Sequence, residues 1–159
     1  MLIMDGMNIV ESMVICNYLE QKYPQPPLYP KDTLANIRVQ EICEFINSSM
    51  QPMQSTRVMK KLRENEGDQR EWLSFFMKKG LNAVSRRRES HPGRFTIGDT
   101  LTMADVFLYP QLYNARLYGI DLDNEYPSLH AVERVLDEID AFKESRPEEQ
   151  PDYKPEFPK

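Results

Sequence analysis

The sequence has only two cysteines, one tryptophan and no long hydrophobic run among its 159 residues. Cys16 and Cys43 are too few for a disulfide framework, so we expect a protein of the reducing cytoplasm. The longest apolar runs have four or five residues, such as Val106–Tyr109. A transmembrane helix needs about 20 apolar residues, so these runs exclude one. The first residues also lack the basic flank and apolar core of a signal peptide.

Positive charge is in the minority, with 20 Lys and Arg against 25 Asp and Glu and a net charge of −5. This balance argues against nucleic acid or an anionic membrane as a partner. The basic run Arg86–Arg88 is interpreted as a favourable charge at a helix C-terminus. Neither His91 nor His130 has a ligand partner at useful spacing, so no metal site is predicted.

Two clusters of proline divide the chain, because proline removes an amide donor and disfavours helix before it. The first cluster predicts a linker and the second an extended tail. The prolines are Pro24, Pro26, Pro27 and Pro30, then Pro147, Pro151, Pro155 and Pro158. The expected units are a small N-terminal unit at 1–23, a linker at 24–31, a helical domain at 32–146 and a Pro-rich tail at 147–159.

The small unit contains a hairpin signal, because Asp5-Gly6 separates two short apolar segments, 2–4 and 7–9. A helix is expected to follow over about 11–22. One hairpin and one helix cannot bury a core alone, since three or more strands are normally needed. We therefore expect this unit to be the end of a larger α/β domain whose beginning is absent.

The helical domain is predicted from apolar residues at helical spacing. Asp32 or Thr33 caps a first helix, which Pro52 kinks near Met50, and a second helix starts near Asp68. The predicted apolar positions are Leu34, Ile37, Ile42, Phe45 and Ile46, then Trp72, Phe75, Phe76, Leu81 and Val84.

A third helix is expected to begin at Thr102 and to end before Gly119, with a second kink at Pro110. Thr102–Asp105 has the spacing of a capping box, and Leu101 and Val106 are placed to form a hydrophobic staple. A last helix is predicted over about 128–144, giving a compact bundle of about five helices.

Glu11-Ser12 opens the first predicted helix and is the pair with most chemical content. Free amides at a helix N-terminus bind a carboxylate, and the Ser12 hydroxyl can donate to the same group. The Glu11 carboxylate can pair with an ammonium, so together they suit an α-amino acid head group. Ordinary helix capping by an acid and a serine is the alternative interpretation.

Several segments resemble the zeta class of glutathione transferases, which includes maleylacetoacetate isomerase. The resemblance spans nearly the whole chain and predicts a mainly α fold, in which a transferase C-terminal helical bundle follows the remnant of a thioredoxin-like domain. The segments that carry it are Asp5-Gly6, Ile9–Ser12, Gln51–Gln54, Gly98–Asp105, Pro110–Arg116 and Gln150–Asp152.

The resemblance implies that glutathione is the cofactor and that Glu11 and Ser12 hold its γ-glutamyl head. It also implies that glutathione reaches the helical domain at Gln51, Ser55, Thr56 and Arg57. Ser55 departs from the family, which usually has Asn there. For Gln51 the alternative is a polar residue that solvates the kink at Pro52.

The family places a substrate-binding arginine one position after Arg116, where this chain has Leu117. Arg116 is therefore either a substitute that leans inward or the sign of a lost carboxylate contact. A shift of one residue rotates a side chain by about 100° around a helix.

The family activates the glutathione thiol with a Ser-Ser-Cys segment near the start of its first domain. This chain begins after that point, and Ser48-Ser49-Met50 is interpreted as structural because fold position makes that site. We therefore predict no catalytic residue in this chain.

Two functions are considered. The first is glutathione-dependent cis-trans isomerisation of a small diacid in phenylalanine and tyrosine catabolism, by a cytoplasmic homodimer, with this shortened form inactive. The second is a non-catalytic helical domain that dimerises or scaffolds partners.

Overall fold

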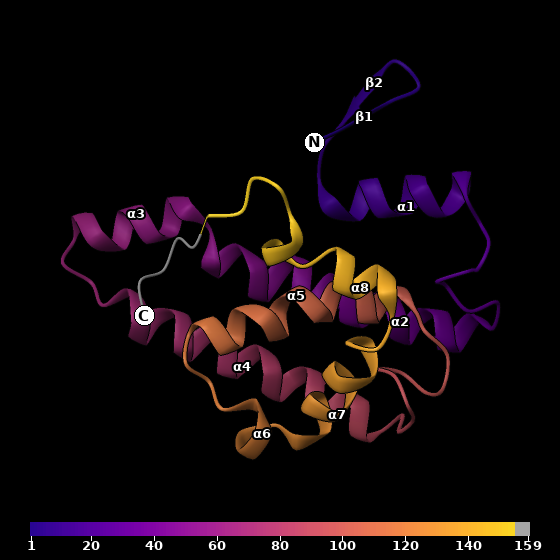
Figure 1. Cartoon of the computed structure of the whole chain (residues 1–159). Coiled ribbons are helices and arrows are strands. Elements are labelled where there is room, and N and C mark those ends of the chain that lie inside the picture. Colours follow the sequence, from indigo (N-terminus) through magenta and orange to yellow (C-terminus); the bar gives the residue numbers. More distant parts are fainter. Residues whose placement is uncertain (155–159) are drawn as a thin grey trace.

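The computed structural model describes residues 1–154 as a β-hairpin followed by a bundle of helices (Figure 1). The hairpin projects away from the bundle, and α1 lies between the hairpin and the bundle (Figure 1). The elements are β1 (Leu2–Met4), β2 (Met7–Ile9), α1 (Ser12–Lys22), α2 (Thr33–Phe45), η1 (Ile46–Met50), η2 (Gln51–Gln54), α3 (Thr56–Glu64), α4 (Gln69–Glu89), α5 (Met103–Leu117), α6 (Leu122–Glu125), α7 (Pro127–Leu136), α8 (Asp140–Glu144) and η3 (Pro147–Glu149). Within the described part of the chain, no helix has both the length and the apolar character needed to cross a membrane.

The predicted hairpin is confirmed, with β1 and β2 antiparallel and Leu2 opposite Ile9. Its turn places Asp5 at φ 51° and Gly6 at φ 73°, the positive values that a two-residue hairpin turn requires. Lys22 Nζ lies 2.6 Å from both carboxylate oxygens of Asp5, and the Tyr18 hydroxyl donates to the same carboxylate. The turn is therefore fastened to the last turns of α1.

The linker is held against both neighbouring units. The Glu20 carboxylate of α1 accepts the backbone N–H of Leu28 at 2.9 Å and that of Tyr29 at 3.3 Å. The Leu28 carbonyl in turn accepts the Met103 N–H at the start of α5, at 2.8 Å. These bonds fix the position of α1 relative to the bundle, and Met13 packs against the bundle core.

Helix α2 begins where it was predicted, with the Asp32 carboxylate accepting the Ala35 N–H at 2.8 Å. Its buried face differs from the prediction, because Leu34 is 72% exposed and Ile37 is 45% exposed. These two positions lie roughly opposite the buried stripe, given about 100° of rotation per residue. The stripe consists of Val39, Ile42, Cys43 and Ile46.

The predicted kink near Met50 is confirmed. Helix α2 passes into the π-helical turn η1 and then into the 3-10 turn η2, which contains Pro52. Gly80 of α4 allows the close approach of this kink, since a Cβ there would lie 2.4 Å from Met50 Cγ. Helix α3, which follows the kink, has no counterpart in the predicted helices.

Helix α4 starts as predicted, where Asp68 accepts the N–H groups of Arg70 and Glu71 at 2.8 and 3.0 Å. Phe75 is 60% exposed, which corrects its expected place among the apolar positions of this helix. Leu73 and Met77 occupy the buried face of α4, where Phe75 was expected to lie.

The predicted capping box at Thr102 is confirmed. The fully buried Asp105 carboxylate accepts the N–H groups of Thr96 and Thr102, each at 2.8 Å, and the Thr102 hydroxyl at 3.1 Å. Helix α5 continues through Pro110 to Leu117, so the proline does not interrupt it. Asp105 therefore joins the preceding loop to the first turn of the central helix.

The single helix expected over 128–144 is two helices, α7 and α8, separated at 137–139. The short helix α6 precedes them. The tail also differs from an extended segment, because it opens with η3, where Glu148 accepts the Tyr113 hydroxyl at 2.6 Å. Pro155 and Pro158 lie outside the described residues.

Acidification is expected to release the hairpin from α1. Hydrogen bonds from Lys22 and Tyr18 lower the pKa of Asp5 below its usual value near 3.8. A lowered carboxyl pKa stabilises the folded state above the unfolded pKa, and this contribution is lost as the pH falls through the folded pKa. NMR hydrogen exchange of the β2 amides should show protection that begins to fall below about pH 5 and is lost as the pH falls further, through the lowered pKa of Asp5.

Asp5→Asn is the matched variant, because Asn also accepts a positive φ. It should show weaker protection at neutral pH and no acid transition. An unchanged transition in this variant would assign the effect to another group.

Removing the Asp105 carboxylate is expected to destabilise the bundle strongly. Asp105→Ala leaves the buried N–H groups of Thr96 and Thr102 without their acceptor. The free energy of unfolding should fall by about 3 kcal/mol, measured by urea denaturation. Asp105→Asn keeps one acceptor oxygen and should lose less. Equal stability of the Ala variant and the native chain would show that these bonds contribute nothing.

Candidate functional site

Glu11 occupies an unusual backbone conformation immediately before α1, with φ 69° and ψ 120°. A positive φ at a residue other than glycine costs about 1–3 kcal/mol and often marks a ligand-binding position. In the described part of the chain, the exposed Glu11 side chain makes no capping bond to α1. The alternative of ordinary capping therefore does not account for Glu11.

The first turn of α1 begins with Ser12, whose side chain is exposed. The first backbone bond of the helix runs from the Ile15 N–H to the Glu11 carbonyl, at 2.9 Å. The N–H groups of the residues before Ile15 have no acceptor within the helix, as at any helix start. The α1 tip thus combines amide donors, a hydroxyl and a carboxylate in two adjacent residues.

The second predicted group follows the kink. Gln51 opens η2 and is exposed, and Thr56 and Arg57 are exposed on the first turn of α3. Ser55 caps α3, with its hydroxyl oxygen 3.5 Å from the Val58 nitrogen. Figure 1 shows the first turns of α1 and α3 on the same upper side of the molecule.

The Met50 carbonyl at the kink accepts a side-chain hydrogen bond, and its donor is Gln54. Gln54 Nε2 donates to the Met50 carbonyl at 3.2 Å and to Gln111 Oε1 at 2.7 Å. Gln54 Oε1 accepts from Asn114 Nδ2 at 2.9 Å and from the Tyr118 hydroxyl at 3.3 Å. Gln54, rather than Gln51, therefore supplies the kink with its hydrogen bond.

This amide cluster was missed by sequence reasoning, although its signal was present. Gln54 ends the Gln-Pro-x-Gln segment, and Gln111 and Asn114 lie in the Pro-Gln-x-x-Asn-Ala segment. Both segments carried the family resemblance, and the structure joins them by hydrogen bonds.

Helix α4 supports the same segment from its other side. Trp72 Nε1 donates to the Met53 carbonyl at 3.0 Å, and Gln69 Nε2 donates to the Met59 carbonyl at 2.6 Å. The segment that carries the exposed residues after the kink is therefore held by hydrogen bonds to two helices, α4 and α5.

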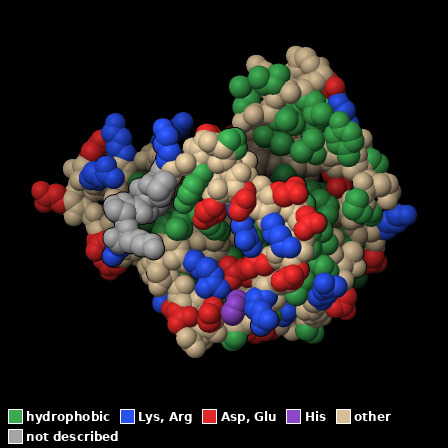
Figure 2. Space-filling view, viewed as in Figure 1, with side chains coloured by type: hydrophobic (Ala, Val, Ile, Leu, Met, Phe, Trp, Pro, Cys, Tyr) green, Lys and Arg blue, Asp and Glu red, His purple; other side chains and the backbone are tan. Residues whose placement is uncertain are grey.

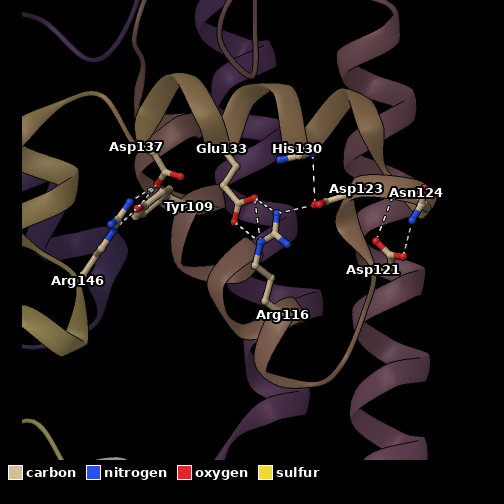
Figure 3. A network of polar contacts seen from close by, with 9 residues as sticks. All are labelled: Tyr109, Arg116, Asp121, Asp123, Asn124, His130, Glu133, Asp137 and Arg146. Atoms are coloured by element: carbon tan, nitrogen blue, oxygen red, sulfur yellow. Dashed lines mark hydrogen bonds and ion pairs between the residues drawn. The ribbon is translucent and has the colours of Figure 1, made fainter.

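Arg116 does not join the other predicted residues. Its guanidinium faces α7 and α6, where Nε lies 2.9 Å from Glu133 Oε1 and Nη2 lies 2.9 Å from Asp123 Oδ1 (Figure 3). The hydrogen bonds to Glu133 raise the pKa of Arg116 further. The next residue, Leu117, is 46% exposed. Of the two interpretations of Arg116, this geometry favours a lost carboxylate contact.

Neither cysteine provides an activated thiol. Burial raises the pKa of Cys43 to about 12, and it also raises the pKa of Cys16. A thiolate is the nucleophilic form, so both side chains remain thiols near neutral pH. Ser48 and Ser49 lie exposed on η1 with their hydroxyls 3.3 Å apart. The described residues thus offer groups for binding a zwitterion but show no prepared nucleophile.

The comparisons match this chain to known proteins over most of its length. The family described as glutathione S-transferase, C-terminal domain, matches residues 77–141. A probable maleylacetoacetate isomerase of Drosophila melanogaster is 37% identical over 97% of this chain and 66% of its own length. The maleylacetoacetate isomerase of Mus musculus is 35% identical over 93% of this chain and 67% of its own length.

A solved structure gives a similar result. The maleylacetoacetate isomerase of Anaeromyxobacter dehalogenans, crystallised with glutathione in its active site, is 40% identical and superposes with a TM-score of 0.89. The alignment covers 95% of this chain and 71% of that one. The chain therefore spans about two thirds of the length of the relatives that it matches.

Proposed function

The chain belongs to the family of maleylacetoacetate isomerases and zeta-class glutathione transferases, and on that premise we propose that it holds glutathione at the tip of α1. The observation that carries the proposal is the strained conformation of Glu11, whose exposed carboxylate caps nothing in the described chain. Strain of this kind persists only where the surrounding structure imposes it, and it concentrates at ligand-binding positions.

The head group of glutathione fits the chemistry of this tip. The γ-glutamyl end carries one ammonium and one carboxylate. The carboxylate of Glu11 pairs with the ammonium, while the Ser12 hydroxyl and the free amides of the first turn donate to the carboxylate. The ammonium of the ligand is thus paired with an acidic side chain, and its carboxylate with hydrogen-bond donors, at the same helix tip.

The rest of the tripeptide extends to the residues after the kink, Gln51, Ser55, Thr56 and Arg57. The exposed side chains among these supply an amide, a hydroxyl and a guanidinium, which suit the peptide groups and the carboxylate of glutathione. Support for glutathione as the ligand comes from the relative that is solved with glutathione in its active site.

The reaction we propose for the family member is isomerisation of a conjugated cis diacid in the breakdown of phenylalanine and tyrosine, in a cytoplasmic homodimer. Glutathione supplies the nucleophilic thiolate when bound. This chain's residues bind and orient it, while the sequence contains no Ser-Ser-Cys triplet and its own thiols are not ionised. We therefore propose that the 159 residues alone bind glutathione without turnover.

A second candidate is a non-catalytic helical domain that associates with partners. Apolar side chains on the hairpin and α1 favour it, since Ile3, Met7, Val10 and Val14 are all at least half exposed. Figure 2 shows apolar side chains gathered over this part of the molecule. Contiguous exposed apolar surface promotes association.

Glu11→Ala should weaken glutathione binding about tenfold, equivalent to about 1.4 kcal/mol, as measured by titration calorimetry. The melting temperature should not fall, because the side chain is exposed and caps nothing. Glu44→Ala, at an exposed position on α2, is the matched control and should bind as the native chain does.

A ligand analogue sharpens this experiment. Glutathione without its α-amino group should bind the native chain and Glu11→Ala equally, because the variant lacks only the partner of the ammonium. If the variant still weakens binding of this analogue, Glu11 does not contact the ammonium.

The purified 159-residue chain should bind glutathione and give no measurable glutathione-dependent isomerisation of maleylacetoacetate. The physical reason is that the sequence lacks the Ser-Ser-Cys triplet that would stabilise the glutathione thiolate. A spectrophotometric isomerase assay beside a full-length relative tests this, and turnover above the uncatalysed rate would contradict it. A chain that neither binds nor turns over would favour the non-catalytic alternative.

A further inference from the structure

We propose that Gln54 is a positioning residue, whose side-chain amide holds the segment Gln51–Arg57 in the conformation that receives glutathione. The inference rests on the proposed function. It adds a residue that does not contact the ligand itself, because the Gln54 side chain is turned towards Met50 and α5.

The Gln54 amide uses its full hydrogen-bonding capacity. Two donated bonds reach the Met50 carbonyl and Gln111 Oε1, and two accepted bonds come from Asn114 and Tyr118. A primary amide has two N–H donors and two acceptor sites, so no other side chain of this length satisfies all four partners. The saturated amide therefore has one orientation.

The Gln54 amide binds the backbone close to Pro52. Proline has no N–H, so the helical bond that residue 52 would donate to the Ser48 carbonyl is missing, and the α-helix gives way to other turns. The Gln51 N–H bonds to the Ile46 carbonyl in the π-helical turn, and the Met50 carbonyl accepts from Gln54. Gln54 thus adds a side-chain bond to the part-buried backbone where the two turns meet.

The partners of Gln54 are themselves fixed. Gln111 is 4% exposed and belongs to α5, whose start is fastened by the buried Asp105. From a second helix, α4, Trp72 donates to the carbonyl of Met53, the residue before Gln54. The turn is thus hydrogen-bonded to two helices, while Gln51 stays exposed.

Trp72 also makes the inference measurable, because it is the single tryptophan in the chain and its Nε1–H bonds to this turn. Gln54→Ala should alter the emission of Trp72 in the absence of any ligand. The same variant should raise the Kd for glutathione about tenfold, measured by titration calorimetry. Gln40→Ala, an exposed amide on α2, should change neither quantity.

A stability control separates positioning from general destabilisation. Leu136→Ala removes a fully buried side chain from a different apolar cluster and should lower the melting temperature. It should leave Trp72 emission and glutathione affinity unchanged. If Gln54→Ala only lowers the melting temperature, as Leu136→Ala does, the inference is overturned.

Gln54→Glu gives a second test that does not depend on the Ala variant folding. A carboxylate at this position cannot donate to the Met50 carbonyl, whereas a protonated carboxyl can donate once. The Kd of this variant, relative to that of the native chain, should therefore fall as the pH is lowered from about 8 to about 5. A ratio independent of pH would contradict the role assigned to the donated bond.

The two proposals fail differently. If the native chain does not bind glutathione, the proposed function fails and positioning for glutathione fails with it, whatever Trp72 reports. If the native chain binds and Gln54→Ala binds equally well with unchanged emission, only the positioning role fails.

Discussion

The inability of proline to donate a backbone hydrogen bond determines much of the architecture around Pro52. Helix α2 is not continued past Pro52, because the chain passes through the turns η1 and η2 before α3 begins. At the end of η2, the Gln54 side chain donates to the Met50 carbonyl. The Gln54 side chain is bonded to Gln111 of α5, while Gln51 in the same turn is exposed. The turn that contains Pro52 thus carries both a saturated amide and a proposed binding residue.

The elements predicted best are those determined by local chemistry. The Asp5-Gly6 turn, the cap at Asp32, the helix start near Asp68 and the Thr102 capping box depend on residues within a few positions, and each is confirmed. The mainly helical fold of the glutathione transferase C-terminal type is confirmed as well. The division of the chain into units at 1–23, 24–31, 32–146 and 147–159 remains a prediction.

The sequence could not show which side of each helix is buried against the rest of the bundle. Leu34, Ile37 and Phe75 have helical spacing, yet they point away from the core, because an apolar stripe does not identify its partner. The same limit applies to Arg116, whose ion pairs come from α6 and α7, 7 and 17 residues further along the chain. Likewise, the Gln54 cluster joins segments 57 to 64 residues apart, so spacing alone could not reveal it.

Binding glutathione and activating its thiol are separate physical tasks, and the function proposed for this chain is the first. Recognition of a zwitterionic head group needs fixed opposite charges and amide donors, which a strained residue at a helix tip provides without a large core. Lowering a thiol pKa needs a donor or positive charge held beside the sulfur. Burial raises the pKa of both thiols in this chain, which shows surroundings of the opposite kind. In the proposed function, affinity for glutathione is therefore independent of catalysis.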